Sequence, residues 1–213
     1  MPLLEADNIA HWFDYPLFRG VDLAIEAGES LAVQGVSGSG KSTLLHILSS
    51  FLKPQKGTVK AFGKHIYALK SGELAALRRE SVGLIFQQHY LFKGFSAREN
   101  IQVAALLCGT RIDPALLSDL GIAHILDQDS SSLSGGQQQR LSIARVLTKK
   151  PKLLFADEPT GNLDRKTANE AMEILFDYTR KNRCAFFLVT HDEALAKKAD
   201  RRYRLENGAL TLQ

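Results

Sequence analysis

The stretch "SLAVQGVSGSGKST", residues 30–43, opens on a compact apolar run, continues through a turn that contains three glycines, and ends on Lys-Ser-Thr. Apolar residues then recur at positions 44, 45, 48, 51 and 52, which is the spacing of a helix. We expect that helix to end before Pro54, because a residue that precedes proline disfavours the helical region. The stretch therefore predicts a strand, a glycine turn and a helix in direct succession.

This turn has the pattern of a loop that binds nucleotide phosphates. Two glycines are separated by four residues and followed by lysine and serine, between a predicted strand and a predicted helix. The glycines let the backbone wrap the phosphates, Lys41 reaches the β- and γ-phosphates, and the Ser42 hydroxyl binds Mg²⁺. The predicted nucleotide-binding residues of the turn are Gly35, Val36, Ser37, Gly38, Ser39, Gly40, Lys41, Ser42 and Thr43.

A second apolar strand ends in two adjacent carboxylates. "LLFADE", residues 153–158, places Asp157 and Glu158 at the carboxyl end of a strand, where α/β sheets bind ligands. Asp157 is predicted to hold Mg²⁺, directly or through water, and Glu158 is then free to polarise an attacking water. Two acids after a strand would by themselves indicate a solvated loop, but beside the phosphate-binding turn they indicate a hydrolytic site.

Two further polar residues follow strands that are expected to end at the same sheet edge. Gln87 follows the predicted strand 82–86, and His191 follows the predicted strand 185–190. His191 is predicted to contact the γ-phosphate, and Gln87 to contact Mg²⁺ or the attacking water. Taken singly, the two residues have alternative interpretations as a capping histidine and a loop glutamine.

Strands alternate with helices along most of the chain. Strands are predicted at 3–9, 21–27, 30–35, 57–63, 82–86, 152–157, 185–190 and 201–206, and helices at 71–80, 137–150 and 165–181. This alternation predicts an α/β fold with a mostly parallel sheet covered on both faces. Residues 88–132 differ, because they contain short helical pieces near 97–107 and 113–127 and little strand character. We interpret them as a separate helical lobe.

The composition is that of a globular protein with a mild basic excess. The 213 residues allow one large domain or a core with a smaller lobe, and 45% of them are apolar and 23% charged. A net charge of +4 suits an anionic ligand or an anionic membrane surface. Two basic clusters are interpreted as solvated faces: Lys149, Lys150 and Lys152, and Arg201, Arg202 and Arg204.

The two cysteines and the N-terminal sequence indicate in which cellular compartment the protein is expected. Cys108 and Cys184 are far apart, carry no metal-ligand spacing and predict no disulfide framework, so we expect a reducing compartment. Cys184 precedes an apolar run and is interpreted as a small buried hydrophobe. The start "MPLLEADN" lacks the regions of a signal peptide, and no apolar run approaches the roughly 20 residues that span a bilayer. We therefore expect no direct membrane span, and any membrane role requires a partner chain.

A second glycine turn lies in "SSLSGGQQQRLSIARVL", residues 131–147. A glycine pair that opens a helix is an anion site, because backbone N–H groups point outward and the helix dipole favours negative charge. The first turn belongs to the sheet core, whereas the second borders the helical lobe. One nucleotide therefore cannot use both turns of the same chain.

Together these motifs resemble those of the ATP-binding subunits of the ABC transporter family, in the same order and spacing and over nearly the whole chain. "LSGGQ", residues 133–137, is similar to that family's own diagnostic motif, which is far more specific than a phosphate loop. The other matching features are "GVSGSGKS" (phosphate loop), Gln87 (glutamine loop), "LLFADE" (second nucleotide motif), "GNLD" at 161–164 (aspartate loop) and His191 (switch histidine).

The resemblance implies a P-loop NTPase fold of the RecA-like kind. Its mostly parallel sheet core would carry an N-terminal antiparallel β-subdomain and an inserted α-helical lobe. Residues 1–213 would form a single ABC ATPase domain, with the core and β-subdomain at 1–87 and 137–213 and the lobe at about 88–136. The implied cofactors are ATP and Mg²⁺.

The resemblance also implies how the nucleotide is held. "IAHWF" puts Phe13 where the family places an aromatic residue against the adenine, although tyrosine is commoner there and Trp12 and Tyr15 lie close by. Two subunits would pair head to tail, so that the "LSGGQ" turn of one caps the γ-phosphate held by Lys41 of the other. A homodimer with two equivalent sites is the simplest prediction. The residues that complete the nucleotide-binding set are Ser134, Gly135, Gly136, Gln137 and Asp164.

The implied partner is a membrane permease encoded as a separate chain. The ATPase would then be cytoplasmic, peripheral on the cytoplasmic face of the inner membrane, and would bind no nucleic acid. A DNA-repair ATPase head shares these motifs but carries a long coiled coil between Lys41 and Ser134, where this chain has no sustained heptads. A soluble iron–sulfur assembly ATPase is the other alternative from a different class.

A finer resemblance concerns the transported substrate. "DEPTGNLD" resembles the group that contains lipoprotein-releasing, macrolide-export and cell-division ATPases, and "GKSTLLHIL" and "QQHYLFKGFSAREN" (87–100) look most like the lipoprotein-releasing subunit. "DSSSLSGGQ" departs from the family in lacking the proline often found just before the diagnostic motif. Lipoprotein release is the expected function, with a cell-division ATPase or a small-molecule or macrolide exporter as alternatives.

Overall fold

A six-stranded sheet forms the centre of the protein in the computed structural model, which describes residues 1–161 and 163–213. Its strand order is β10-β9-β3-β8-β7-β6. All neighbours are parallel except β10, which pairs antiparallel with β9. The strands are β3 (Ser30–Gln34), β6 (Val82–Phe86), β7 (Leu153–Asp157), β8 (Ala185–Val189), β9 (Arg201–Glu206) and β10 (Ala209–Leu212). The predicted α/β class with a mostly parallel sheet is confirmed.

A smaller antiparallel sheet with the order β2-β1-β4-β5 comes from the N-terminal part of the chain. Its strands are β1 (Leu4–Trp12), β2 (Pro16–Ile25), β4 (Lys56–Ala61) and β5 (Lys64–His65). The predicted strands 3–9 and 21–27 are too short, because the aromatic residues between them also pair across the hairpin. His11 pairs with Phe18 and Trp12 with Pro16, so these residues extend the hairpin, as their preference for strands favours.

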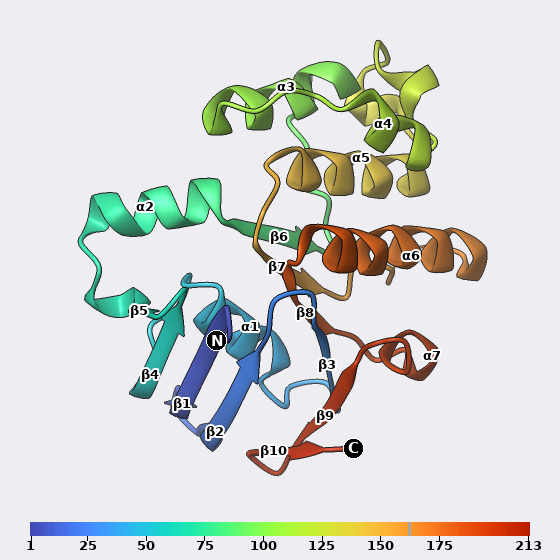
Figure 1. Ribbon diagram of the computed structural model, residues 1–213. Helices are drawn as coiled ribbons and strands as arrows, with labels where there is room; N and C mark the ends of the chain where they lie inside the picture. The colour runs from blue at the N-terminus through green and yellow to red at the C-terminus, as the bar shows by residue number, and fades with distance from the viewer. Residues whose placement is uncertain (162) are drawn as a thin grey trace.

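Helices cover the central sheet on both faces (Figure 1). They are α1 (Lys41–Leu48), α2 (Ser71–Glu80), α3 (Ala97–Cys108), α4 (Pro114–Asp119), α5 (Gly135–Thr148), α6 (Arg165–Asn182) and α7 (Glu193–Ala196), with short 3₁₀ turns at η1 (Ile66–Ala68), η2 (Ala123–Ile125) and η3 (Ser130–Ser132). In Figure 1, α3 and α4 lie together beyond α5, which separates them from the sheet. The segment that carries α3 and α4 is therefore connected to the sheet through α5.

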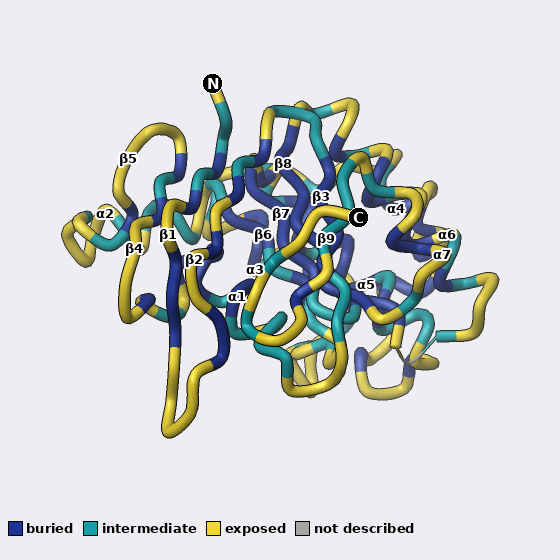
Figure 2. Tube along the Cα trace, turned by 90° about the horizontal axis from the view of Figure 1, so that it is seen from below, coloured by how far each residue is buried: buried dark blue, intermediate teal, exposed yellow. Residues whose placement is uncertain are grey.

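The alternation of side chains along β8 shows how the core is divided. Phe186 and Leu188 belong to the apolar cluster with α5 and α6, whereas Ala185, Phe187 and Val189 belong to the cluster with α1 and the antiparallel sheet. Every residue of β8 is buried, and the central strands are the dark core of Figure 2. This burial on both faces is why the parallel strands have continuous apolar sequences.

Some sequence-based expectations about local structure are wrong. The helix predicted at 113–127 is broken, because α4 ends before Gly121, which has a φ of +63° and starts a new direction toward η2. The strands β5 and β10 and the helix α7 were not predicted, since each has at most four residues and is too short for a periodic pattern.

Two members of the basic clusters are only partly exposed and are bound within the chain, contrary to the expectation of fully solvated faces. The Lys149 ammonium donates to the carbonyl oxygens of Arg78 and Val82 at 3.1 and 2.7 Å, and its burial lowers its pKa. Arg201 pairs with Glu29 at 2.5 Å. Both side chains bridge elements distant in sequence, which the local clustering of charges does not reveal.

The expectation for Cys184 is confirmed. Its side chain is buried, and burial raises the pKa of the thiol to about 12. Both cysteines are free thiols. Among the helices of residues 1–161 and 163–213, we find none with the length and apolar character needed to cross a membrane.

Candidate nucleotide site

The glycine turn after β3 is closed by contacts with its own chain. Gly35 follows the strand directly, and a Cβ atom there would lie 2.3 Å from the Leu205 carbonyl oxygen on β9. Gly40 has a φ of +98° and precedes α1, so it offers no side chain to cap the first amides of that helix. The result is a helix N-terminus whose outward N–H groups face the loop, which is the geometry that binds phosphate.

Lys41 lies inside this loop. Its ammonium group donates to the carbonyl oxygens of Gly35 and Val36 at 2.8 and 2.9 Å. The side chain therefore spans the loop that precedes it, and the positive charge is held where the backbone amides gather. The Ser39 hydroxyl oxygen in the same loop is buried and has no hydrogen-bond partner among the described residues.

Asp157 ends β7 beside this turn. Burial raises the pKa of its carboxyl, and a hydrogen bond from the Ser42 hydroxyl acts in the opposite direction. Oδ1 of Asp157 is buried and has no hydrogen-bond partner among the described residues. A carboxylate and a hydroxyl in contact, with one buried oxygen unsatisfied, form the donor set that a hard cation such as Mg²⁺ prefers, so the residues present fit the metal.

Glu158 follows at a sharp bend of the backbone. Its φ is +46°, which is uncommon for a residue with a side chain, and its N–H donates to the Val189 carbonyl at 2.9 Å. This bend turns the Glu158 carboxylate toward His191, whose Nδ1 lies 2.9 Å from Oε2. The two residues therefore form one unit at the carboxyl edge of β7 and β8.

Gln87 and Phe13 approach from two other directions. A Cβ atom on Gly161 would lie 2.9 Å from Nε2 of Gln87, so the glutamine packs closely on the turn that follows Glu158. Phe13 is half exposed at the tip of the β1–β2 hairpin, and its ring is edge-on to His11 with centroids 4.9 Å apart. Its free face is available for stacking.

A cleft of about 510 Å³ joins these groups. The predicted residues that line it are Phe13, Gly35, Ser37, Gly38, Gly40, Lys41, Ser42, Thr43, Gln87, Asp157, Glu158 and His191. Sequence reasoning did not assign Tyr15, Leu17 and Val189, which also line it. Tyr15 and Leu17 lie on the same hairpin as Phe13, and that adjacency was the available signal.

The second glycine turn lies elsewhere on the chain. Ser134 caps α5 and forms a capping box with Gln137: the Ser134 N–H donates to Oε1 of Gln137 at 2.9 Å, and the Gln137 N–H donates to the serine hydroxyl at 3.4 Å. Asp164 caps α6 by accepting from the N–H groups of Lys166 and Thr167. None of the predicted residues Ser134, Gly135, Gly136, Gln137 and Asp164 lines the cleft.

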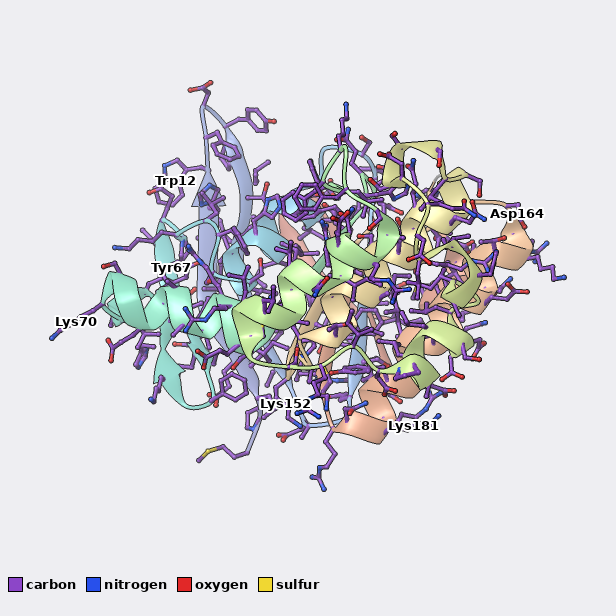
Figure 3. The ribbon with its side chains drawn as sticks, turned by 90° about the horizontal axis from the view of Figure 1, so that it is seen from above. Trp12, Tyr67, Lys70, Lys152, Asp164 and Lys181 are labelled. Atoms are coloured by element: carbon purple, nitrogen blue, oxygen red, sulfur yellow. The ribbon has the colours of Figure 1, made fainter. Side chains whose placement is uncertain are left out.

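Figure 3 shows where the predicted residue Asp164 lies relative to the β1–β2 hairpin. Asp164 at the start of α6 lies across the molecule from Trp12, which neighbours Phe13 on the hairpin. A Cβ atom on Gly135 would have no described atom within 4 Å. Within one chain, the two glycine turns are thus separate sites, as expected. Asn162 of the "GNLD" motif lies outside the described residues.

A second, more apolar groove of about 690 Å³ lies between α2, α3 and α5. The Arg78 guanidinium lies over the Phe51 ring at 4.9 Å, and that of Arg145 over the Phe92 ring at 5.6 Å. Leu107 of α3 is largely exposed at its wall. The groove is therefore apolar with a basic rim.

The family model described as "ABC transporter" matches residues 18–161, which carry both the phosphate loop and the acidic strand end. The chain belongs to this family and is one of its ATP-binding subunits, an ATP hydrolase.

Particular relatives refine this class. The chain is 42% identical to the lipoprotein-releasing system ATP-binding protein LolD of Xanthomonas campestris pv. campestris (strain 8004), over 92% of this chain and 84% of that protein. It is 41% identical to the macrolide export ATP-binding/permease protein MacB of Marinobacter nauticus, over 98% of this chain but 34% of that protein. Among solved structures, the ATP-binding cassette MJ0796 bound to ADP and Pi superposes with a TM-score of 0.86 at 30% identity, over 96% of this chain and 95% of that one. The chain is thus an ATPase subunit of the LolD and MacB type.

Proposed function

We propose that this ATPase powers lipoprotein release, by coupling ATP-driven pairing of two copies to a separate membrane permease. The observation that carries the proposal is the 42% identity over 92% of the chain with a protein named for that system. The complete set of nucleotide motifs supports an active enzyme rather than a silent subunit. Macrolide export is the second candidate, since the identity with MacB is nearly as high.

In this proposal different residues of the cleft bind the adenine, the phosphates and Mg²⁺ and activate the attacking water. Phe13 stacks on the adenine, and Lys41 with the amides of the glycine turn holds the phosphates. Ser42, Asp157 and Gln87 would hold Mg²⁺, which when bound neutralises charge on the β- and γ-phosphates. Glu158 accepts a proton from the attacking water, and the 2.9 Å contact with His191 orients its carboxylate.

The "LSGGQ" turn acts across an interface between two copies. The open space around Gly135 supports this, because nothing described within the chain requires a glycine there. The outward amides at the start of α5 would cap the γ-phosphate held by the other copy. The cassette MJ0796 is described as dimeric, which is in line with such pairing.

The groove between α2, α3 and α5 is our candidate for permease docking. Its apolar walls and its basic rim (Arg78, Arg79, Arg145, Lys149) suit a permease segment that presents apolar side chains and at least one carboxylate. In this proposal the helical lobe, residues 88–136, forms one wall. The subunit would be held peripherally on the cytoplasmic face of the inner membrane.

Co-purification tests the proposal. A permease with four membrane spans and a large external domain, isolated with this chain and carrying bound acylated protein, is the expected result. Recovery with a cell-wall hydrolase activator would instead indicate a cell-division ATPase. Leu107→Asp should release the permease by placing a charge in the groove, whereas Leu212→Asp, at an equally exposed leucine on β10, should retain it.

A further inference from the structure

One buried amide joins three segments that carry functional residues. Gln139 lies on the second turn of α5 and is 1% exposed. Its Nε2 donates to the Pro159 carbonyl at 2.5 Å, one residue after Glu158. Its Oε1 lies 2.5 Å from Nδ1 of His89, two residues after Gln87. The helix opened by the second glycine turn is thereby connected to both strand-end loops of the nucleotide cleft.

The chemistry of the partners sets the direction of each hydrogen bond. The Pro159 carbonyl can only accept, so the NH₂ group of Gln139 must face it. The amide oxygen then faces His89, which must donate from Nδ1. Only a side chain with an N–H group at that position completes the arrangement.

The backbone of the loop that carries His89 is also hydrogen-bonded to α5. Arg145, further along α5, donates to the carbonyl oxygens of Tyr90 and His89 at 2.7 and 3.1 Å. The rings of Tyr90 and Phe92 line the apolar groove, and the Arg145 guanidinium covers Phe92. A displacement of the loop at the groove therefore moves His89 and its hydrogen bond to Gln139.

The two strand-end loops also touch directly, since Gln87 packs on Gly161. His89 and Gln139 form a second connection on the buried side. These two contacts together restrict rotation of the Glu158–Pro159 segment, and so the direction of the Glu158 carboxylate.

We propose that His89 is a positioning residue for ATP hydrolysis: by donating to Gln139, it holds the segment that follows Glu158 in place relative to Gln87. His89 lies outside the nucleotide cleft, so its effect is on turnover and not on ATP affinity. The proposal rests on the hydrolytic activity of the chain and is independent of the transported substrate.

The test compares two substitutions in the full-length chain. Asn keeps an N–H donor near the place of Nδ1, whereas Leu keeps the volume and removes the donor. His89→Leu should lower kcat about tenfold and leave the KM for ATP within about twofold, because a buried acceptor loses its partner. His89→Asn should restore kcat to within about threefold of the unsubstituted chain. His65→Leu, at an exposed histidine on β5, is the matched control and should change neither constant.

A double substitution separates positioning from a general loss of structure. His89→Leu combined with Gln139→Leu should lower kcat no more than the worse single change, since both remove the same hydrogen bond. If His89→Leu does not fold, His89→Gln replaces it, because its amide reaches the place of Nε2 and not of Nδ1. Unchanged kcat in the donor-less variant, equal losses with Asn, or additive losses in the double variant would each overturn the proposal.

Discussion

The two glycine turns of this molecule look alike in sequence but differ in what requires their glycines. At the first turn, a side chain on Gly35 would meet the Leu205 carbonyl at 2.3 Å, so packing within the chain requires glycine. At the second, a Cβ atom on Gly135 would have no described atom within 4 Å. Packing within the chain therefore requires glycine at the first turn, whereas no described contact within the chain requires it at Gly135.

The helix caps differ in the same sense. Gly40 at the start of α1 leaves the first amides of that helix open toward Lys41 and the cleft. Ser134 and Gln137 cap α5 reciprocally, through bonds of 2.9 and 3.4 Å. The first turn is ready for phosphate, while the second offers a phosphate only those amides that its own cap does not use. This difference fits our proposal that the first turn of one copy binds the phosphates and the second turn of the other copy contacts the γ-phosphate.

Glu158→Gln gives the largest effect and isolates the first site. The amide cannot accept a proton from water, so turnover should fall at least about 100-fold while ATP still binds. An ATP-bound dimer should then accumulate, as measured by phosphate release and by size-exclusion chromatography with ATP. Glu193→Gln, which alters an exposed ion pair with Lys197 on α7, should keep normal turnover. Undiminished phosphate release from Glu158→Gln would contradict the assignment.

Gly135→Asp breaks the second site and spares the first. A carboxylate at the start of a helix is favourable, so the monomer should stay folded and bind ATP. The same charge would face the γ-phosphate of the other copy, so we expect dimerisation to disappear and hydrolysis to fall about 100-fold. Gly72→Asp is the matched control, because Gly72 also lies in the first turn of a helix with open space around it. Surviving ATP-driven dimerisation would refute the interface role of Gly135.

Gly35→Ala and Gly135→Ala compare the two turns directly. The added methyl at Gly35 should destabilise the protein by about 1–3 kcal/mol and weaken ATP binding, because the Leu205 carbonyl must move. The same change at Gly135 should leave stability equal or raise it by about 0.5 kcal/mol, since alanine suits a helix better than glycine. Urea unfolding with a parallel ATP titration measures both. Equal stability losses would mean that the two turns do not differ as described.

The central fold was predictable because its signals are local. Buried strands such as 82–86 have continuous apolar sequences, and the strand, glycine turn and helix at 30–48 follow one another without interruption. The extent of the β1–β2 hairpin was not predictable, since it depends on cross-strand pairing of His11 with Phe18, which the local sequence does not display. The role of Lys149 depends equally on carbonyl groups distant in sequence.

The site was predictable to the level of which residues meet. Parallel strands end at one edge, so Gln87, Asp157, Glu158 and His191 were expected together, and they line one cleft. Their mutual contacts were not predictable. The bond between Glu158 and His191 follows from a positive φ that sequence does not display, and the junction at Gln139 needs the packing of α5 against two loops. Asp164, also predicted to bind nucleotide, lies outside this cleft.

Substitutions of Asp164 should give the smallest effect. Asp164 caps a helix within the chain, and the family resemblance also places it in the nucleotide-binding set. Inside the chain it caps α6 by accepting from Lys166 and Thr167 at 3.0 and 3.1 Å. Asp164→Ala should therefore lower Tm by about 3 °C, whereas Asp164→Asn should preserve it, since asparagine is an equally good cap.

The pH dependence of this cap has a definite sign. Hydrogen bonds from Thr167 lower the pKa of the Asp164 carboxyl. The stabilisation by the charged cap is then complete above the ordinary carboxyl pKa of about 4 and is lost as the pH falls through the lower value of the folded protein. The Tm difference between Asp164 and Asp164→Ala should shrink accordingly in acid. If the carboxylate also acts at the interface, Asp164→Asn should keep its Tm at neutral pH and still lose ATP-driven dimerisation. Retained dimerisation in that variant would leave the helix cap as the whole role of Asp164.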